Sequence, residues 1–323
     1  MRRLSVCNSP GGSVILLNQS PPSTPRTDSE IRLQGCERAQ QKLLRFVTRF
    51  PKDGRSMMLY GASASSFLYL AKQVAKQQPE IEVHYVRMRH FVARSAGQDC
   101  KQVLTGLFSK SQDKKKLVFF YLLDTLYLGS MSMEQLEFAQ RVRECLPSHL
   151  KHVMAASNDC VIVVASARKP WILPESLQST FHKWTYVGLP GQEERIDLFK
   201  AYIGKMVSSL SEQNYLQLSR MTEEYTYSEI GNVVEEAHLG PFKRIESASH
   251  FLKEKDLWRP CTSSDPGAVE LSWHTMKPAE VSEPIIYEDL LDGFVKVERK
   301  RNDKCMKDLM RVKETHSRGS FSR

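Results

Sequence analysis

One stretch of the chain has the order of elements that holds phosphate groups. Residues 56–76 (SMMLYGASASSFLYLAKQVAK) begin with the apolar run 57–60, continue as a loop of Gly, Ala and Ser, and become apolar at helical spacing from Phe67. A strand, a small-residue loop and a helix form the scaffold of a phosphate-binding loop, whose backbone N–H groups and helix N-terminus hold phosphate. The chemistry that this stretch could support is nucleotide binding.

The side chains that carry out this chemistry are absent. In the pattern G-x-x-x-x-G-K-[ST], Lys contacts the outer phosphates and the Ser or Thr hydroxyl holds magnesium. Counting from Gly61 places Ser66 at the second Gly, Phe67 at the Lys and Leu68 at the Ser or Thr. A Lys at about 4 Å from a phosphate contributes on the order of 4 kcal/mol at an effective dielectric of about 20. We therefore expect no cofactor, no metal and no catalytic residue here. A polar turn that never held phosphate is the alternative interpretation of residues 61–67.

The surrounding pattern predicts an α/β fold. Further apolar runs at 82–86, 117–123 and 161–164 are typical of strands, and helical spacing covers 35–47 and 100–108. Ser132 and Gln135 form a capping box that opens another helix. Continuous apolar strands that alternate with helices predict a parallel sheet covered on both faces.

Beyond Pro190 the pattern becomes helical, and we expect helices over 192–206, 211–220, 226–238 and 241–253. The alternating segment 269–273 predicts a strand of a β-hairpin, and the last forty residues are charged and helical in pattern. The expected organisation has five parts. They are a disordered tail (1–30), an α/β domain (31–190), a small helical domain (191–254), a β-domain insert (255–287) and a C-terminal helical segment (288–323).

Composition excludes several classes of protein. The 323 residues are 41% hydrophobic and 26% charged, as in ordinary globular proteins, and the net charge of +9 favours acidic partners. No helix-turn-helix, zinc or RNP pattern supports nucleic-acid binding. The seven cysteines form no CxxC pair, which indicates a reducing compartment and a cytoplasmic location. The longest apolar run, 117–128, is too short for a transmembrane segment and contains Asp124.

Several stretches resemble the AAA ATPases. Residues 161–171 (VIVVASARKPW) are similar to the sensor-1 strand of that family, and 181–200 (FHKWTYVGLPGQEERIDLFK) to the segment after it. Two further stretches, 241–251 (PFKRIESASHF) and 260–273 (PCTSSDPGAVELSW), resemble the meiotic-clade vacuolar protein sorting ATPases that disassemble ESCRT-III. The resemblance implies an AAA-type parallel sheet domain, then a small helical domain with a β-hairpin insert and a C-terminal helix. In that family the insert binds an activating cofactor protein.

The departures from the family fall on its catalytic positions. They are Phe67 and Leu68 for the Lys and Ser of the phosphate loop, Tyr121 and Leu122 for the Walker B Asp-Glu, Arg168 for the sensor-1 Asn, Ser179 and Thr180 for the arginine fingers, and Ser95 for the pore-loop aromatic. Together they imply a degenerate member, or pseudo-ATPase. The apolar replacements also imply that the Tyr121–Leu122 end of the strand is dry and packed against Phe67 or its helix.

The resemblance therefore implies a catalytically inactive interaction or regulatory module in the ESCRT-III machinery, cytoplasmic and peripheral at endosomal membranes. Its implied partners are active vacuolar sorting AAA ATPase subunits, the β-domain-binding activator or ESCRT-III-associated proteins. We expect Asp265 and Gly267 to form the turn of the insert, Glu270 to face outward and Trp273 to anchor the partner. Alternatively, Trp273 only closes a small core. The alternative function is an unusual ATPase that uses ATP and magnesium weakly.

Overall fold

The computed structural model describes residues 36–49, 51, 54–109, 115–128, 131–155, 161–204, 206–297 and 303–318. Of these, residues 36–188 and 303–318 form one unit (unit 1) and residues 189–297 form a second (unit 2). The predicted tail, 1–30, lies outside the described residues.

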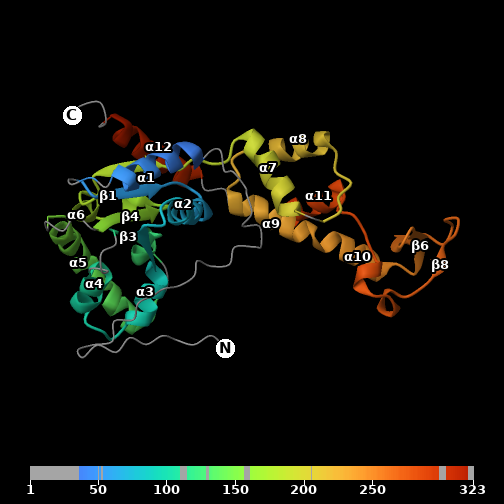
Figure 1. Cartoon of the computed structure of the whole chain (residues 1–323), viewed down its shortest axis with the longest axis horizontal. Helices are drawn as coiled ribbons and strands as arrows, with labels where there is room; N and C mark the ends of the chain where they lie inside the picture. Colours follow the sequence, from blue (N-terminus) through green and yellow to red (C-terminus); the bar gives the residue numbers. More distant parts are fainter. Residues whose placement is uncertain are drawn as a thin grey trace. The chain divides into compact units, whose positions relative to one another are not determined.

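Unit 1 is built on a five-stranded parallel sheet (Figure 1). The strand order is β2-β3-β4-β1-β5. The strands are β1 (Ser56–Tyr60), β2 (Ile81–Arg87), β3 (Lys115–Tyr121), β4 (Val161–Ala167) and β5 (Lys183–Tyr186). All residues of β1 and β4 are buried, as expected for central strands covered on both faces. The predicted α/β fold with a parallel sheet is confirmed.

Helices cover the two faces of this sheet. Helices α1 (Glu37–Arg49) and α2 (Ala64–Gln77) contact each other on one face. Helices α3 (Met88–Ser95), α4 (Cys100–Phe108) and α5 (Met133–Ala155) share a continuous apolar core with the other face. The short helix α6 (Glu175–Gln178) adds Leu177 to that core. The predicted capping box opens α5, because the backbone N–H groups of Ser132 and Gln135 donate to each other's side chains at 3.3 and 3.4 Å.

The last helix, α12 (Asp303–Arg318), belongs to unit 1. Its Leu309 is fully buried, and its His316 ring stacks on Trp184 with centroids 4.0 Å apart. The predicted C-terminal segment 288–323 is therefore divided between the two units. Helix α11 (Tyr287–Lys296) belongs to unit 2, where it packs on α9 (Tyr227–Ala237).

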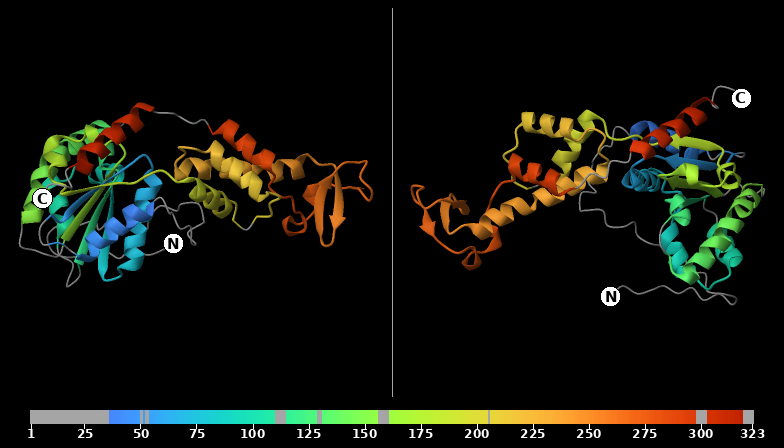
Figure 2. Two further views of the ribbon diagram at one scale, coloured as in Figure 1. Left: turned by 90° about the horizontal axis from the view of Figure 1, so that it is seen from above. Right: turned by 180° about the vertical axis from the view of Figure 1, so that it is seen from behind.

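Unit 2 combines helices with a small antiparallel sheet. The helices are α7 (Gln192–Ile203), α8 (Glu212–Met221), α9 (Tyr227–Ala237), α10 (Leu239–Ser247) and α11. The sheet has the order β7-β6-β8, with β6 (His250–Glu254), β7 (Leu257–Cys261) and β8 (Val269–Glu270). Figure 2 shows this sheet extending from the end of α10.

Two boundaries in unit 2 differ from those predicted. The helix expected over 241–253 ends at Ser247, so the insert begins at β6 and not at residue 255. The reason is tertiary, because Phe251 is fully buried and pairs with Pro260 and Val269. The strand expected over 269–273 contains only Val269 and Glu270, and Trp273 opens a short 3-10 turn (Trp273–Thr275).

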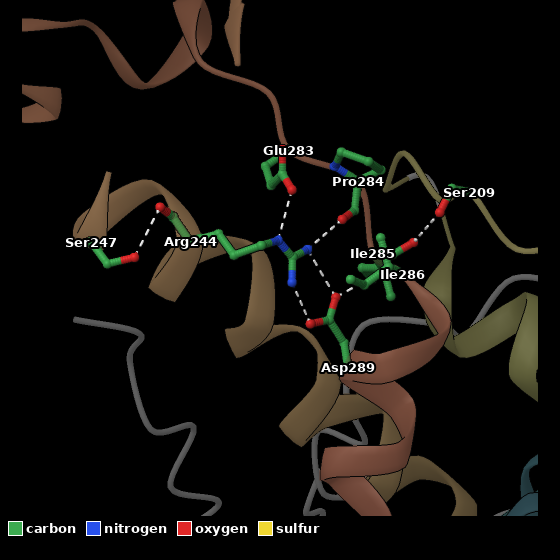
Figure 3. Close-up of polar contacts among 8 residues, drawn as sticks. All are labelled: Ser209, Arg244, Ser247, Glu283, Pro284, Ile285, Ile286 and Asp289. Carbon is green, nitrogen blue, oxygen red and sulfur yellow. Dashed lines mark hydrogen bonds and ion pairs between the residues drawn. The ribbon is translucent and has the colours of Figure 1, made fainter. Parts of the chain in front are cut away.

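The arginine Arg244 joins α10 to the chain that returns from the insert (Figure 3). Its Nη1 and Nη2 atoms donate to both carboxylate oxygens of Asp289 at 2.6 and 3.0 Å. Its Nε donates to Glu283 at 2.7 Å, and Nη2 also donates to the Pro284 carbonyl at 2.7 Å. We call these contacts the Arg244 clamp. Paired guanidinium and carboxylate forks of this kind are strong and fix orientation.

The clamp is enclosed on the side of α10. A Cβ atom at Gly240 would overlap the carboxylate of Asp289, so only glycine lets α10 approach α11 this closely. The same carboxylate accepts a hydrogen bond from the Ile286 N–H at 2.9 Å and so begins α11. Asp289 is 6% exposed, which makes the pair largely protected from water.

We predict that Arg244→Met destabilises unit 2 by on the order of 2 kcal/mol, because it leaves the buried Asp289 carboxylate without its cation. Arg244→Lys should destabilise unit 2 less than Arg244→Met does, since a single ammonium replaces only part of the guanidinium fork. Urea unfolding and hydrogen exchange of residues 250–261 provide the measurement. The control is Arg259→Met, which breaks an exposed pair with Glu254 and should cost less than about 0.5 kcal/mol. Equal effects of Arg244→Met and Arg259→Met would contradict the clamp.

Candidate functional site

Backbone hydrogen bonds hold the start of the loop after β1 against the neighbouring strand ends. Gly61 donates its N–H to the Ala167 carbonyl at 3.4 Å, and the Tyr60 carbonyl accepts from Val187 at 2.8 Å. A Cβ atom at Gly61 would overlap the Val187 carbonyl oxygen. Glycine is therefore required here for close backbone packing. Gly61 has a structural function whether or not a phosphate is ever bound.

The first turn of α2 is part of the hydrophobic interior. Phe67 is 0% exposed and Leu68 is 5% exposed. The Phe67 ring thus fills the core and does not lie in an open loop. The hydroxyls of Ser63 and Ser65 contact each other at 3.0 Å, and the buried Ser66 Oγ has no hydrogen-bond partner among the residues that the structure describes. Neither position 67 nor position 68 offers a cation or an oxygen to a nucleotide and its magnesium.

The carboxyl end of β3, at Tyr121 and Leu122, is not the dry edge that we expected. Tyr121 and Leu122 are both half-buried. Burial raises the pKa of the Tyr121 hydroxyl, and the nearby positive charges of Arg87 and Arg168 oppose that rise. Leu122 has a left-handed backbone (φ 55°), and its N–H donates to Ser166 Oγ at 2.9 Å. The prediction that this end of the strand is dry is therefore wrong, although neither side chain can hold magnesium or activate water as a carboxylate does.

The buried carboxylate at this edge is Asp124, which sequence reasoning did not select. It is 0% exposed, and its Oδ2 accepts the backbone N–H groups of Arg168 and Lys169 at 3.2 and 3.1 Å. Burial raises the pKa of Asp124, and these hydrogen bonds partly oppose the rise. Asp124 therefore positions the chain after β4. The signal that could have revealed it is a lone acid inside an apolar run.

The two positions implied for the arginine fingers are occupied by short side chains that bond locally. Thr180 Oγ1 donates to the Leu177 carbonyl at 2.6 Å, and Ser179 Oγ donates to Ser176 at 3.1 Å. Ser95 is buried at the end of α3, and Arg168 is exposed. The residues present do not fit an ATP–magnesium group, because they supply no loop lysine, magnesium hydroxyl, Walker B carboxylate pair or finger.

The four residues predicted for partner binding lie together in the insert of unit 2, but they have different functions. Asp265 Oδ2 accepts the backbone N–H and the hydroxyl of Thr262 at 2.7 and 2.9 Å, and these hydrogen bonds lower its pKa. Gly267 has a left-handed φ of 88°, which favours glycine. Asp265 and Gly267 therefore shape the loop, and the predicted turn is confirmed.

The other two residues are presented to solvent. Glu270 is exposed, as predicted, although the neighbouring Val269 is exposed as well and the strand does not alternate. Glu270 lies opposite His250 on β6. Trp273 is half-buried, and its ring lies 4.2 Å from that of His274. Exposed Leu257 and Val269 lie in the same small sheet. The insert thus presents a carboxylate, an indole and apolar side chains to solvent.

The described ranges contain no helix long and apolar enough to cross a membrane. Nor do those ranges contain a group of three or more His, Cys, Asp or Glu side chains arranged to hold a metal ion.

We predict that Asp124→Ala lowers stability by about 2 kcal/mol, because two buried N–H groups lose their acceptor. Asp124→Asn keeps an acceptor oxygen and should be at least as stable as the parent at pH 7. Because the folded pKa lies above the unfolded value of about 3.9, the parent should lose stability relative to Asp124→Asn as the pH rises above about 4. Urea unfolding at several pH values measures both effects. If Asn at pH 7 costs as much as Ala, the charge itself is required and our interpretation is wrong.

Comparisons with known proteins agree with this geometry. No protein-family model matches the chain. Vacuolar protein sorting-associated protein 4B of Pongo abelii is 26% identical over 273 residues, covering 79% of this chain and 61% of its own length. Vacuolar protein sorting-associated protein 4 of Dictyostelium discoideum is 27% identical over 261 residues, covering 75% and 58%. The chain thus spans about three fifths of the length of these relatives.

A solved structure shows the same fold. The crystal structure of the FIGL-1 AAA domain superposes with a TM-score of 0.67 at 16% identity, covering 88% of this chain and 87% of that domain. At this identity the likeness concerns the fold alone. The chain is similar in sequence to vacuolar protein sorting-associated proteins 4 and 4B and has the fold of an AAA domain.

Proposed function

We propose that this chain is a catalytically inactive AAA-fold protein that acts as an interaction or regulatory module in the ESCRT-III machinery of endosomal sorting. The observation that supports this most strongly is the burial of Phe67 and Leu68 in the first turn of α2. In an active loop these positions contact phosphate and magnesium. Here they stabilise the core of unit 1.

Loss of activity follows from the number of separate requirements that are unmet. Phosphoryl transfer needs a cation on the outer phosphates, a held magnesium ion, an oriented water and a finger from a neighbour. Phe67, Leu68, Tyr121, Leu122 and Ser179 supply none of these. Because these groups act as one constellation, restoring a single one cannot restore turnover.

The insert supports the interaction role. Two hydrogen bonds from Thr262 to Asp265 stabilise its turn, Glu270 ends β8, and Trp273 follows three residues later. Trp is enriched among residues that dominate binding energy, and a nearby charge adds specificity. We propose that this surface docks the β-domain-binding activator or an active vacuolar sorting ATPase subunit. We also propose that the protein acts in the cytoplasm and at the surface of endosomal membranes.

We predict that the purified protein does not hydrolyse ATP and that Phe67→Lys does not restore hydrolysis. The lysine would gain a phosphate contact, but magnesium and water would remain unheld. The mutant should also be less stable, since a buried Phe is worth about 3 to 5 kcal/mol. Phosphate release against a mock purification is the measurement. Turnover by either protein above that control would favour the alternative of a weak, unusual ATPase.

A second prediction concerns the insert. Glu270→Lys should weaken binding to the isolated activator or to the active ATPase about tenfold without changing the melting temperature, because Glu270 is exposed. Trp273→Ala should weaken binding at least as much. The matched control is Glu246→Lys, which reverses an exposed charge on α10. Titration by biolayer interferometry measures all three. If Glu270→Lys and Trp273→Ala bind every candidate partner as tightly as the parent does, the insert is only a structural remnant and the docking role is wrong.

A further inference from the structure

Helix α1 of unit 1 carries a row of cations that neither the nucleotide scaffold nor the insert uses. The buried residues of this helix are all apolar, whereas each of its Lys and Arg residues is exposed. These cations are Arg38, Lys42, Arg45 and Arg49. Their spacing places them within an arc of about 60° on a helix of about 3.6 residues per turn, in a row about 16 Å long. We call this row the α1 stripe.

The side chains around the α1 stripe do not neutralise it. The acid of α1 is Glu37, which lies outside the arc, at about 100° from Arg38. Helix α1 packs against α2 and β5, and neither element contains an Asp or a Glu. Among the described residues, no cation of the stripe forms an ion pair or a side-chain hydrogen bond. A row of like charges that pairs with no acid of its own fold is available to an anionic partner.

A fifth cation lies beside the stripe, on the edge strand of the sheet. Lys183 begins β5 and is exposed, and its Nζ lies 5.1 Å from the centre of the Phe46 ring of α1. The Phe46 side chain is buried, so the ammonium group lies over the contact between α1 and β5. The cations therefore project from two elements that are packed against each other. Pre-organised groups lose less entropy when a partner binds.

The form of the stripe fits a flat anionic surface. A straight row of cations on the outer side of a helix needs no shaped ligand, and a bilayer that contains phosphatidylserine presents a broad layer of negative charge. Each Lys or Arg near such a surface strengthens binding about fivefold. A single-stranded nucleic acid would need aromatic side chains on which its bases stack, and the aromatic residue of α1, Phe46, is buried. The charge and the shape of the stripe thus favour a membrane.

We propose that the α1 stripe and Lys183 bind the anionic headgroups of a bilayer that contains phosphatidylserine. The guanidinium forks would pair with phosphate and carboxylate oxygens through two hydrogen bonds each, and the ammonium groups would add point charges. The apolar face of α1 belongs to the core of unit 1, so the attraction is electrostatic and the helix does not insert. Such a contact gives the proposed location at endosomal membranes a physical basis, and it rests on the proposed function for the choice of membrane.

Co-sedimentation of the full chain with vesicles tests the stripe. The vesicles contain phosphatidylcholine and phosphatidylserine, and vesicles of phosphatidylcholine alone are the comparison. Arg45→Glu/Arg49→Glu should weaken binding to the anionic vesicles at least about tenfold, whereas Arg45→Lys/Arg49→Lys keeps both charges and should change it less than about threefold. The matched control is Lys101→Glu/Lys151→Glu, which changes the net charge equally on exposed residues of α4 and α5. This control should also change binding less than about threefold.

Two further measurements separate the charge of the stripe from other effects. Binding of the parent should fall at least about tenfold between about 0.1 M and about 1 M salt, because the Debye length shortens from about 10 Å to about 3 Å. All three double variants should melt at the temperature of the parent, because the changed side chains are exposed.

Several results would overturn the proposal. They are equal or absent binding to the two kinds of vesicle, equal loss with the two glutamate variants, equal loss with Arg45→Lys/Arg49→Lys, and binding that salt does not weaken. Displacement from the vesicles by an oligonucleotide or by polyglutamate at a lower concentration of charge would assign the stripe to nucleic acid or to an acidic protein instead. Because no arm contains ATP or the activator, failure here leaves the loss of catalysis and the role of the insert untouched.

Discussion

Burial of the first turn of α2 is the constraint on which this molecule depends. In a phosphate-binding loop the first helical turn must stay open to a charged ligand, since its free N–H groups and its lysine are directed at phosphate. Here Phe67 and Leu68 are removed from water and pack with the rest of α2 beside the sheet. Full burial of one such side chain contributes about 1.5 to 3 kcal/mol. In a phosphate-binding loop the first turn of the helix binds phosphate. In this chain the first turn of α2 contributes to the stability of the fold.

The same edge of the sheet, at the carboxyl end of β3, also lacks an open polar site. Tyr121 ends β3 and Leu122 follows it, while the buried carboxylate of Asp124 accepts the backbone N–H groups of Arg168 and Lys169. These hydrogen bonds link the segment after β3 to the chain that follows β4. The chain has the fold of an AAA domain and is 26% identical to vacuolar protein sorting-associated protein 4B. Fold and function are separable in this way because function depends on a few side chains.

Local sequence signals predicted much of the architecture. The apolar run 161–164 identified β4, and the helical pattern over 226–238 identified α9. At the start of α9, Thr226 and Glu229 each accept a hydrogen bond from the other's backbone N–H. Signals that depend on distant contacts could not be detected. Residues 250–254 continue a helical pattern but form β6, because Phe251 pairs with two other strands. Arg244 and Asp289 are 45 positions apart, so nothing in the sequence shows that they form the clamp.

Only the local features of the candidate site could be predicted from the sequence, for the same reason. The spacing from Gly61 identified the loop and its missing lysine, since that pattern is local. It did not show that Phe67 lies in the core or that Asp124 holds the chain after β4. Each of these depends on how separate elements pack against one another.

Equilibrium binding of labelled ATP to the purified full chain, with and without magnesium, tests the central claim most directly. Burial of Phe67 and Leu68 and the absence of a magnesium ligand predict no saturable binding up to millimolar nucleotide, and no effect of magnesium. Saturable, magnesium-dependent binding at micromolar ATP would contradict that claim, because it would require the first turn of α2 to open and a different set of side chains to hold the phosphates.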